Sequence, residues 1–298
     1  MNEKALKIGL YDIDSRIPNL ALMKLSTYHK KLGDFVEWYS PLFHATYDKI
    51  YGSKVFNFSD KGYIREDMEI GGSGFDLHKE LPHEIEHTYP DYSLYPKCDY
   101  ALGFITRGCI RNCKFCIVPQ KEGWIKKNAD LEEFCQDQSK VMLLDNNILA
   151  LEDHVEELDR LRKSKKKIDF NQGLDIRLIN HENASILKEI KRWKGLRLRF
   201  AFDNIKLKDI IEEKLNIFQD IGISQGTIQF YVLIGYNSTR REDLIRINFL
   251  KKNHIDAFAM PYKNMDPYQK QFARWVNRHY FKYQTFQSYQ NKKHMEAC

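Results

Sequence analysis

One stretch decides how this chain folds: Tyr100-Ala-Leu-Gly-Phe-Ile-Thr-Arg-Gly-Cys-Ile-Arg-Asn-Cys-Lys-Phe-Cys-Ile-Val-Pro-Gln-Lys-Glu-Gly123. Its apolar run over residues 101–106 predicts a buried strand that ends at the following Arg-Gly pair. Three cysteines come next, Cys109, Cys113 and Cys116, with C-x3-C-x2-C spacing. Three thiolates on one short loop can converge on a single centre. A [4Fe–4S] cluster takes four ligands, so three protein cysteines would leave one iron open to a small molecule.

Zinc is the competing interpretation of these cysteines. Cys98 would supply a fourth thiolate and close a tetrahedral all-cysteine site. Zinc sites favour two separated C-x2-C pairs, and this sequence has no second pair. The alternative function is still that of a zinc-stabilised, nucleic-acid-binding protein, in which the zinc ligands would be Cys98, Cys109, Cys113 and Cys116.

An aromatic residue, Phe115, stands directly before the third cysteine. With it, the cysteine motif resembles the signature of radical S-adenosylmethionine (SAM) enzymes, and its place after a predicted strand supports the resemblance. The resemblance extends over nearly the whole chain. The members of the family that the chain resembles carry an N-terminal cobalamin-binding-like domain. It implies a [4Fe–4S] cluster held by the three cysteines and SAM on the open iron. It also implies reductive cleavage of SAM to a 5′-deoxyadenosyl radical, which takes a hydrogen atom from the substrate.

Length and composition suit one large or two smaller globular domains. The 298 residues are 43% hydrophobic, enough for a core. The sequence predicts neither a membrane-spanning helix nor a signal peptide. Six cysteines, three of them clustered, do not form a disulfide framework, so we expect a reducing, cytoplasmic setting. Residues 1–97 hold 12 basic and 15 acidic residues and residues 98–298 hold 35 and 26, a basic excess that indicates an anionic partner or a solvated surface.

Residues 1–97 read as an α/β domain. Strands are expected at 6–12 and 35–39 with a helix at 18–32 between them, which predicts a parallel βαβ unit. Further strands or turns are expected at 49–58 and 63–70, followed by a glycine-rich loop with Gly71, Gly72 and Gly74. The polar residues 76–96 read as a linker between domains.

By resemblance, residues 1–97 are a Rossmann-like, cobalamin-binding-like domain with Gly71, Gly72 and Gly74 near the cofactor. A tight turn is the equal alternative for this loop. The D-x-H-x-x-G motif that supplies a histidine to cobalt in many such domains is absent. The sequence therefore does not decide whether cobalamin binds. If cobalamin binds, methyl transfer to an unreactive carbon is the implied reaction.

Residues 98–265 alternate between strands and helices. Six strands are expected, at 101–106, 140–145, 167–172, 196–202, 227–234 and 256–260, with helices at 151–165, 183–193, 207–221 and 241–253. Repeated βα units predict a parallel sheet, and six are fewer than the eight of a closed barrel. We therefore expect a partial (β/α)6 TIM-like barrel, which is also the fold that the radical SAM resemblance implies.

Polar residues cluster where these strands end, as functional residues do in β/α barrels. The resemblance implies roles around SAM: Asp145 or Asn146 for its amino group, Gln172 and Asp175 for its ribose, and Arg177 for its carboxylate. Backbone at Gly235 would approach the adenine, and Phe115 would pack on its edge. The alternative is that the polar residues only cap helices and form turns. No residue is assigned a catalytic role.

Residues 266–298 carry eight aromatic residues interleaved with Lys and Arg. This pattern fits single-stranded nucleic acid, but the helical spacing of Phe272 and Trp275 favours a helical extension that packs against the barrel. The resemblance implies a reductant such as flavodoxin or ferredoxin as a partner. Nothing in the sequence identifies the substrate.

Overall fold

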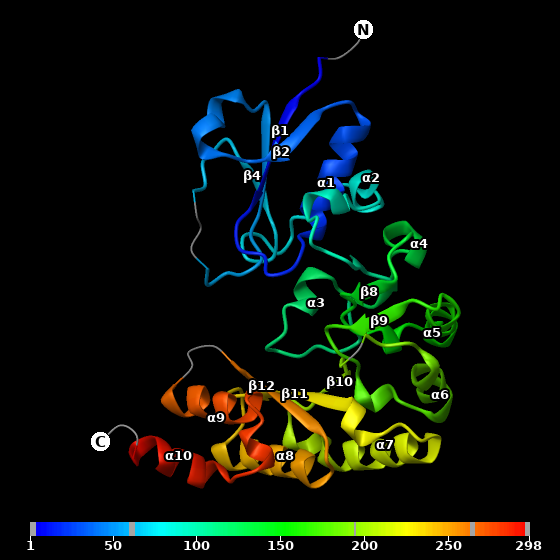
Figure 1. The fold of residues 1–298 in the computed structure, drawn as a ribbon, viewed down its shortest axis with the longest axis vertical. Coiled ribbons are helices and arrows are strands. Elements are labelled where there is room, and N and C mark those ends of the chain that lie inside the picture. The colour runs from blue at the N-terminus through cyan, green and yellow to red at the C-terminus, as the bar shows by residue number, and fades with distance from the viewer. Residues whose placement is uncertain (1–3, 60–62, 194, 263–265, 296–298) are drawn as a thin grey trace. The chain divides into compact units, whose positions relative to one another are not determined.

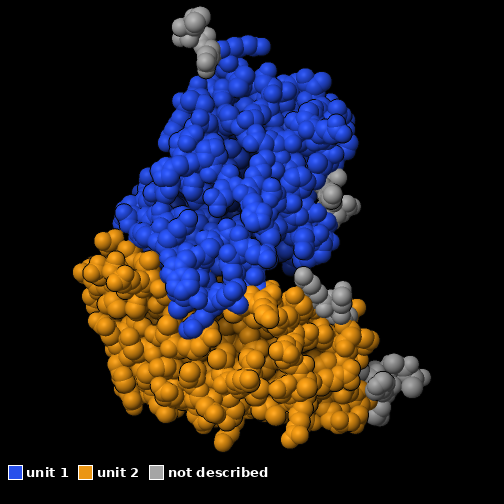
Figure 2. All heavy atoms as spheres, turned by 180° about the vertical axis from the view of Figure 1, so that it is seen from behind, with its two compact units in different colours: residues 1–112, 116–142 blue, residues 113–115, 143–298 orange. Residues whose placement is uncertain are grey.

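The computed structural model describes residues 4–59, 63–193, 195–262 and 266–295, with backbone only for residues 292–295. It divides into two compact units (Figure 2). The first unit comprises Met1–Asn112 and Cys116–Met142, and the second comprises Cys113–Phe115 and Leu143–Cys298. Both units combine helices with parallel strands, so the predicted α/β class is confirmed.

A four-stranded parallel sheet forms the centre of the first unit (Figure 1). Its strand order is β2-β1-β3-β4, with all neighbouring pairs parallel. The helix α1 (Leu20–Lys31) connects the first two strands, as predicted for a βαβ unit. The predicted strand at 63–70 is only partly present, because β4 begins at its end. The strands are β1 (Lys7–Asp12), β2 (Phe35–Trp38), β3 (Lys49–Ser53) and β4 (Glu69–Gly71).

The segment expected to be a linker belongs to the core of the first unit, so that prediction is wrong. It contains the helix α2 (His83–Glu86), and Ile85 packs in a cluster with Ile8 and Leu22. The Asp91 carboxylate accepts a hydrogen bond from Ser26 at 2.6 Å and pairs with Lys30 on α1. Burial of Ile85 and the ion pair of Asp91 outweigh the local proline and polar composition.

The first unit also holds the start of the predicted barrel. The strands β5 (Ala101–Gly103) and β8 (Lys140–Leu143) are neighbours in one sheet. The helices between them in the sequence are the one-turn α3 (Val118–Lys121) and α4 (Leu131–Phe134).

In the second unit, strands and helices alternate where the sequence predicted them. The strands β10, β11 and β12 form a parallel sheet, and α7 and α8 lie along one face of it (Figure 1). The core between them contains Phe200 against Phe218 and Phe202 against Phe249. The elements are α5 (His154–Lys163), β9 (Lys167–Phe170), α6 (His181–Glu189), β10 (Leu198–Ala201), α7 (Lys208–Ile221), β11 (Ile228–Ile234), α8 (Arg240–Lys252) and β12 (Asp256–Pro261).

Each of the six strand regions predicted between Ala101 and Met260 contains a strand. After β9, the Leu174 amide donates to the Arg199 carbonyl at 2.7 Å, which links this loop to β10. The arrangement of the six strands as one partial (β/α)6 barrel, and the domain limits at 97 and 265, remain predictions. No helix in the described part of the chain is both long and apolar enough to span a membrane.

The C-terminal segment is helical and packs through its aromatic side chains. It contains α9 (Pro267–Asn277), a 3-10 turn at Tyr280–Lys282 and α10 (Phe286–Met295). Phe272, Trp275 and Phe281 are almost completely buried. These rings are therefore unavailable for stacking on nucleic acid, whereas Tyr283 is exposed.

Candidate functional site

A two-stranded hairpin closes the base of the cysteine loop. Its strands, β6 (Thr106–Arg107) and β7 (Lys126–Lys127), pair antiparallel. Above them, the Cys109 amide donates to the Gly123 carbonyl at 3.1 Å. Gly108 has φ +86°, and a Cβ there would lie 2.3 Å from the Trp124 carbonyl oxygen. The loop therefore begins and ends at one tightly packed point, and only glycine fits at residue 108.

The local backbone suits sulfur ligands. The Arg111 amide donates to Cys109 Sγ at 3.3 Å, and the Val118 amide donates to Cys116 Sγ at 3.5 Å. All three cysteines of the loop are partly buried. Amide hydrogen bonds to cysteine sulfur stabilise negative charge there and tune iron–sulfur clusters, so these residues fit such a group by donor chemistry.

No preassembled metal site is present among the residues that the structure describes, where no three His, Cys, Asp or Glu side chains are grouped closely enough to hold a metal ion. The ligand set therefore remains a prediction from the sequence of the loop. Cys98, the fourth ligand of the zinc alternative, donates from its thiol to the Tyr100 carbonyl at 3.2 Å. Burial raises the pKa of the Cys98 thiol, which disfavours the thiolate that zinc requires.

Residues 113–115 of the loop belong to the second unit, where Phe115 starts a row of aromatic rings. Its ring meets Tyr236 edge-on at 5.2 Å, and Tyr236 meets Tyr262 at 4.8 Å. Tyr236 follows β11 and Tyr262 follows β12. Phe115 was predicted from its motif, whereas the two tyrosines had only their positions at strand ends as a signal.

Arg177 and Asp175, predicted to contact different parts of SAM, contact each other. Arg177 Nε and Nη2 donate to the two carboxylate oxygens of Asp175 at 2.6 and 2.9 Å. Burial disfavours the charge on Arg177, but the Asp175 carboxylate outweighs it and raises the pKa of the guanidinium. Cys113 and Asp203 act on Arg177 in the same direction. Burial raises the pKa of Asp203, a strand-end residue to which the sequence assigned no role.

The residues predicted to meet the SAM amino group and ribose differ in exposure. Asp145 is buried, and the partly buried Asn146 has a side-chain nitrogen that finds no hydrogen-bond partner in the described part of the chain. Such a buried donor is costly unless another group accepts from it. Gln172 is exposed.

Gly235 directly follows β11, has φ +76° and lies against Gln269 of α9. A Cβ at residue 235 would meet the Gln269 side-chain amide at 2.0 Å. The Gln269 oxygen is buried without a hydrogen-bond partner in the described residues. The backbone beside Gly235 is thus covered by Gln269, a residue that sequence analysis did not single out.

The glycine-rich loop of the first unit packs on the segment after β3. A Cβ at Gly72 would lie 2.3 Å from the Lys54 carbonyl oxygen, and one at Gly74 would lie 2.4 Å from Phe56 backbone. Gly71 pairs with Ser53 in the sheet. Close packing therefore explains Gly72 and Gly74, and the role of the loop near cobalamin remains a prediction.

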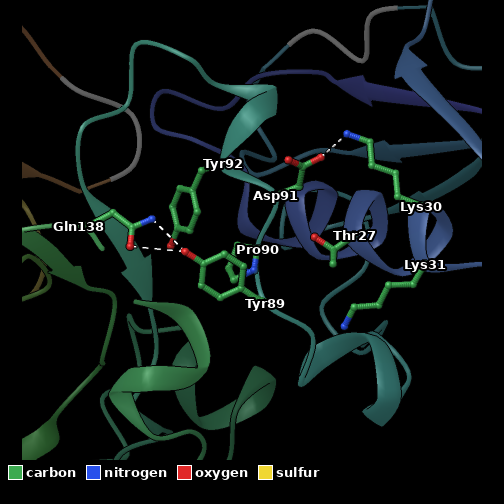
Figure 3. A pocket seen from close by; sticks show the side chains of 8 residues that line it. All are labelled: Thr27, Lys30, Lys31, Tyr89, Pro90, Asp91, Tyr92 and Gln138. Atoms are coloured by element: carbon green, nitrogen blue, oxygen red, sulfur yellow. Dashed lines mark hydrogen bonds and ion pairs between the residues drawn. The ribbon is translucent and has the colours of Figure 1, made fainter. Parts of the chain in front are cut away.

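A surface hollow of about 430 Å³ lies in the first unit (Figure 3). Lys30 is paired with Asp91 there, and Gln138 donates to the Tyr89 hydroxyl at 3.0 Å. None of the predicted site residues lines this hollow, so it adds nothing to the candidate site. Its lining is Thr27, Lys30, Lys31, Tyr89, Pro90, Asp91, Tyr92 and Gln138.

Comparison with known proteins gives a distant similarity to a curated enzyme. No protein-family model matches the chain. The chain is 22% identical over 220 residues to the ribosomal protein uS12 methylthiotransferase RimO of Clostridioides difficile (strain 630). The match covers 70% of this chain but only 45% of that protein's length. This distant similarity supports no more than the radical SAM superfamily as the broad class of the chain.

Proposed function

We propose that this chain is a radical SAM enzyme in which Cys109, Cys113 and Cys116 hold a [4Fe–4S] cluster. The observation that carries the proposal is the closed cysteine loop, with backbone amides directed at two of the three sulfurs. When bound, the cluster and SAM would supply one-electron cleavage to a 5′-deoxyadenosyl radical. The protein's own part is to position SAM and exclude water.

The polar and aromatic residues of the second unit are the proposed SAM contacts. Arg177, held by Asp175, presents a fixed positive charge for the SAM carboxylate. The unpartnered nitrogen of Asn146 is a donor for a ligand oxygen. The rings of Phe115 and Tyr236 offer an edge for the adenine.

Group transfer is the proposed outcome on substrate. The methylthiotransferase similarity makes transfer of a methyl or methylthio group to a macromolecule the first reaction to test. Cobalamin in the first unit and reduction by a flavodoxin or ferredoxin are further parts of this proposal.

A direct experiment is to purify the full chain without oxygen, reconstitute it with iron and sulfide, and add SAM with a strong reductant. We expect about four irons per chain and release of 5′-deoxyadenosine. The Cys109→Ala, Cys113→Ala, Cys116→Ala triple variant should lose both, and Cys135→Ala is the control for a cysteine outside the motif. An active triple variant would contradict the proposal. Zinc in the isolated protein, with no iron uptake, would favour the zinc alternative.

A further inference from the structure

Arg107 lies two residues before Cys109, and its side chain is largely buried at the base of the cysteine loop. Its guanidinium donates through Nη1 to both carboxylate oxygens of Glu122, at 3.1 Å each. Its Nε donates to Asn128 at 3.2 Å, and the guanidinium lies 4.0 Å from the centre of the Phe104 ring. One side chain thus joins the segment before the cysteines to the segment after them.

The same guanidinium is anchored to the N-terminal part of the first unit. Arg107 Nη2 pairs with Glu86 of α2 at 2.7 Å, and Glu86 pairs with Lys24 of α1 at 2.9 Å. A second link joins Lys121, in α3 after the cysteines, to Ser73 of the glycine-rich loop at 2.7 Å. The residues on both sides of the cysteine loop are therefore attached to α1, α2 and the glycine-rich loop.

Arg107 pairs with both Glu86 and Glu122 in this network, and Lys121 also lies 3.6 Å from Glu122. The side chains of Lys24, Glu86, Arg107 and Glu122 are 6%, 18%, 19% and 7% exposed. Burial would raise the pKa of Glu86, but Arg107 and Lys24 outweigh it and hold the pKa below its usual range, so the carboxylate is charged at neutral pH. Buried ion pairs add little net stability over apolar residues of equal volume. The planar guanidinium of Arg107 instead holds the carboxylates of Glu86 and Glu122 in fixed positions.

We infer that Arg107 is a positioning residue, which holds the base of the cysteine loop in one conformation before a cluster binds. The inference rests on the proposed function for its link to iron, but the geometry of the loop is independent of it. In this view the N-terminal α1–α2 region acts as the support of the loop through Glu86 and Lys24. Lysine at residue 107 would keep the charge but would reach only one carboxylate.

The test compares the Arg107→Lys and Glu122→Gln variants with wild type, using the full chain without metal. Trypsin cleavage after Arg111 and Lys114, mapped by mass, reports opening of the loop. We expect both variants to be cleaved about fivefold faster than wild type, because cleavage follows the population of the open loop. Arg162→Gln is the control, since Arg162 also forms two ion pairs, with Asp159 and Glu189 on and beside α5.

Iron retention after anaerobic reconstitution and gel filtration is the second readout. The Arg107→Lys protein should retain about half the iron of wild type, or less, with an altered electron paramagnetic resonance spectrum of the reduced cluster. Wild-type cleavage rates and iron content in both variants would overturn the inference. If wild type itself takes up no iron, the proposed function fails, whereas the cleavage comparison still decides the role of Arg107. Should Arg107→Lys not fold, Glu122→Gln alone decides it.

Discussion

Arg177 and Asp175, two residues apart in one turn, form a bidentate ion pair. The guanidinium nitrogens lie 2.6 and 2.9 Å from the two carboxylate oxygens. The turn is the 3-10 segment Ile176–Leu178, in which Asp175 also accepts from the Arg177 amide. Asp175 is buried, so the charge of its carboxylate is stabilised by this ion pair. The residue proposed to bind the SAM carboxylate is thus already oriented by a neighbour.

Replacing Arg177 by Ala should reduce both stability and SAM affinity. It removes the guanidinium that pairs with the buried Asp175 carboxylate, which we expect to cost about 1–2 kcal/mol, below the value for fully buried pairs because Arg177 is 31% exposed. The measurements are urea unfolding of the apo protein and equilibrium binding of SAM to the reconstituted protein. Arg241→Ala, at an exposed position on α8, is the control. Unchanged SAM affinity in Arg177→Ala would remove this residue from the site.

Gly108 and Gly123 allow the base of the cysteine loop to be tested with two matched substitutions. Both have positive φ, +86° and +71°, but a Cβ at Gly108 would strike Trp124 backbone, whereas Gly123 has open space around it. Gly123→Ala should therefore cost only the backbone strain, about 1–2 kcal/mol. Gly108→Ala should cost more and lower iron uptake. Equal unfolding midpoints and iron contents in the two variants would show that the close approach is unimportant.

Local sequence patterns were sufficient to predict most secondary structure. The apolar spacing in α7 and α8 predicted both helices to within a residue or so of their ends. The linker prediction was wrong because burial of Ile85 against Ile8 and Leu22 is a long-range contact that prolines and polar residues nearby do not reveal.

Side-chain partners at the candidate site were predictable only where the motif is local. The cysteine loop and the Phe115 position could be read from adjacent residues. Gln269 lies 34 positions from Gly235, and Glu86 lies 21 positions from Arg107. Such contacts depend on how helices pack onto strands, so a single sequence carries no direct signal for them.

Acid should loosen the edge of the first sheet through Asp34. This carboxylate contacts His29 Nδ1 at 2.7 Å and accepts from the Leu6 amide at 2.9 Å. Burial would raise the pKa of Asp34, but the hydrogen bonds from His29 and Leu6 outweigh it and hold the pKa below its usual value. The resulting stabilisation is complete above the unfolded-state pKa of about 3.9 and is lost as pH falls through the lower, folded-state value.

The Asp34→Asn variant tests this pH dependence. We expect hydrogen exchange in β1 and β2 to be faster in Asp34→Asn than in wild type at about pH 6, with the difference shrinking towards about pH 3. Comparison at equal pH cancels the intrinsic dependence of exchange on pH. Asp209→Asn, at an exposed position on α7, serves as the control. A difference that persists undiminished at the lower pH would show that the charge on Asp34 is not the cause.

Asp256, at the start of β12, should attach the segment between α9 and α10 to the sheet through His279 and Lys282. It is 2% exposed and pairs with Arg197 at 3.0 Å, His279 at 3.0 Å and Lys282 at 3.1 Å. Asp256→Ala would remove the carboxylate that these three side chains share. The expected loss is about 2 kcal/mol, reduced from the value for buried pairs because each partner side chain is a third or more exposed.

Limited proteolysis would check the prediction for Asp256. In Asp256→Ala we expect earlier cleavage around residues 278–284, which join α9 to α10, because His279 and Lys282 are there released from β12. Phe272 and Trp275 remain buried, so α9 itself should stay protected. Asp220→Asn is the control, since its contact with His181 is long, at 3.6 Å, and exposed. If both variants were cleaved like wild type, aromatic packing alone would hold the C-terminal helices in place.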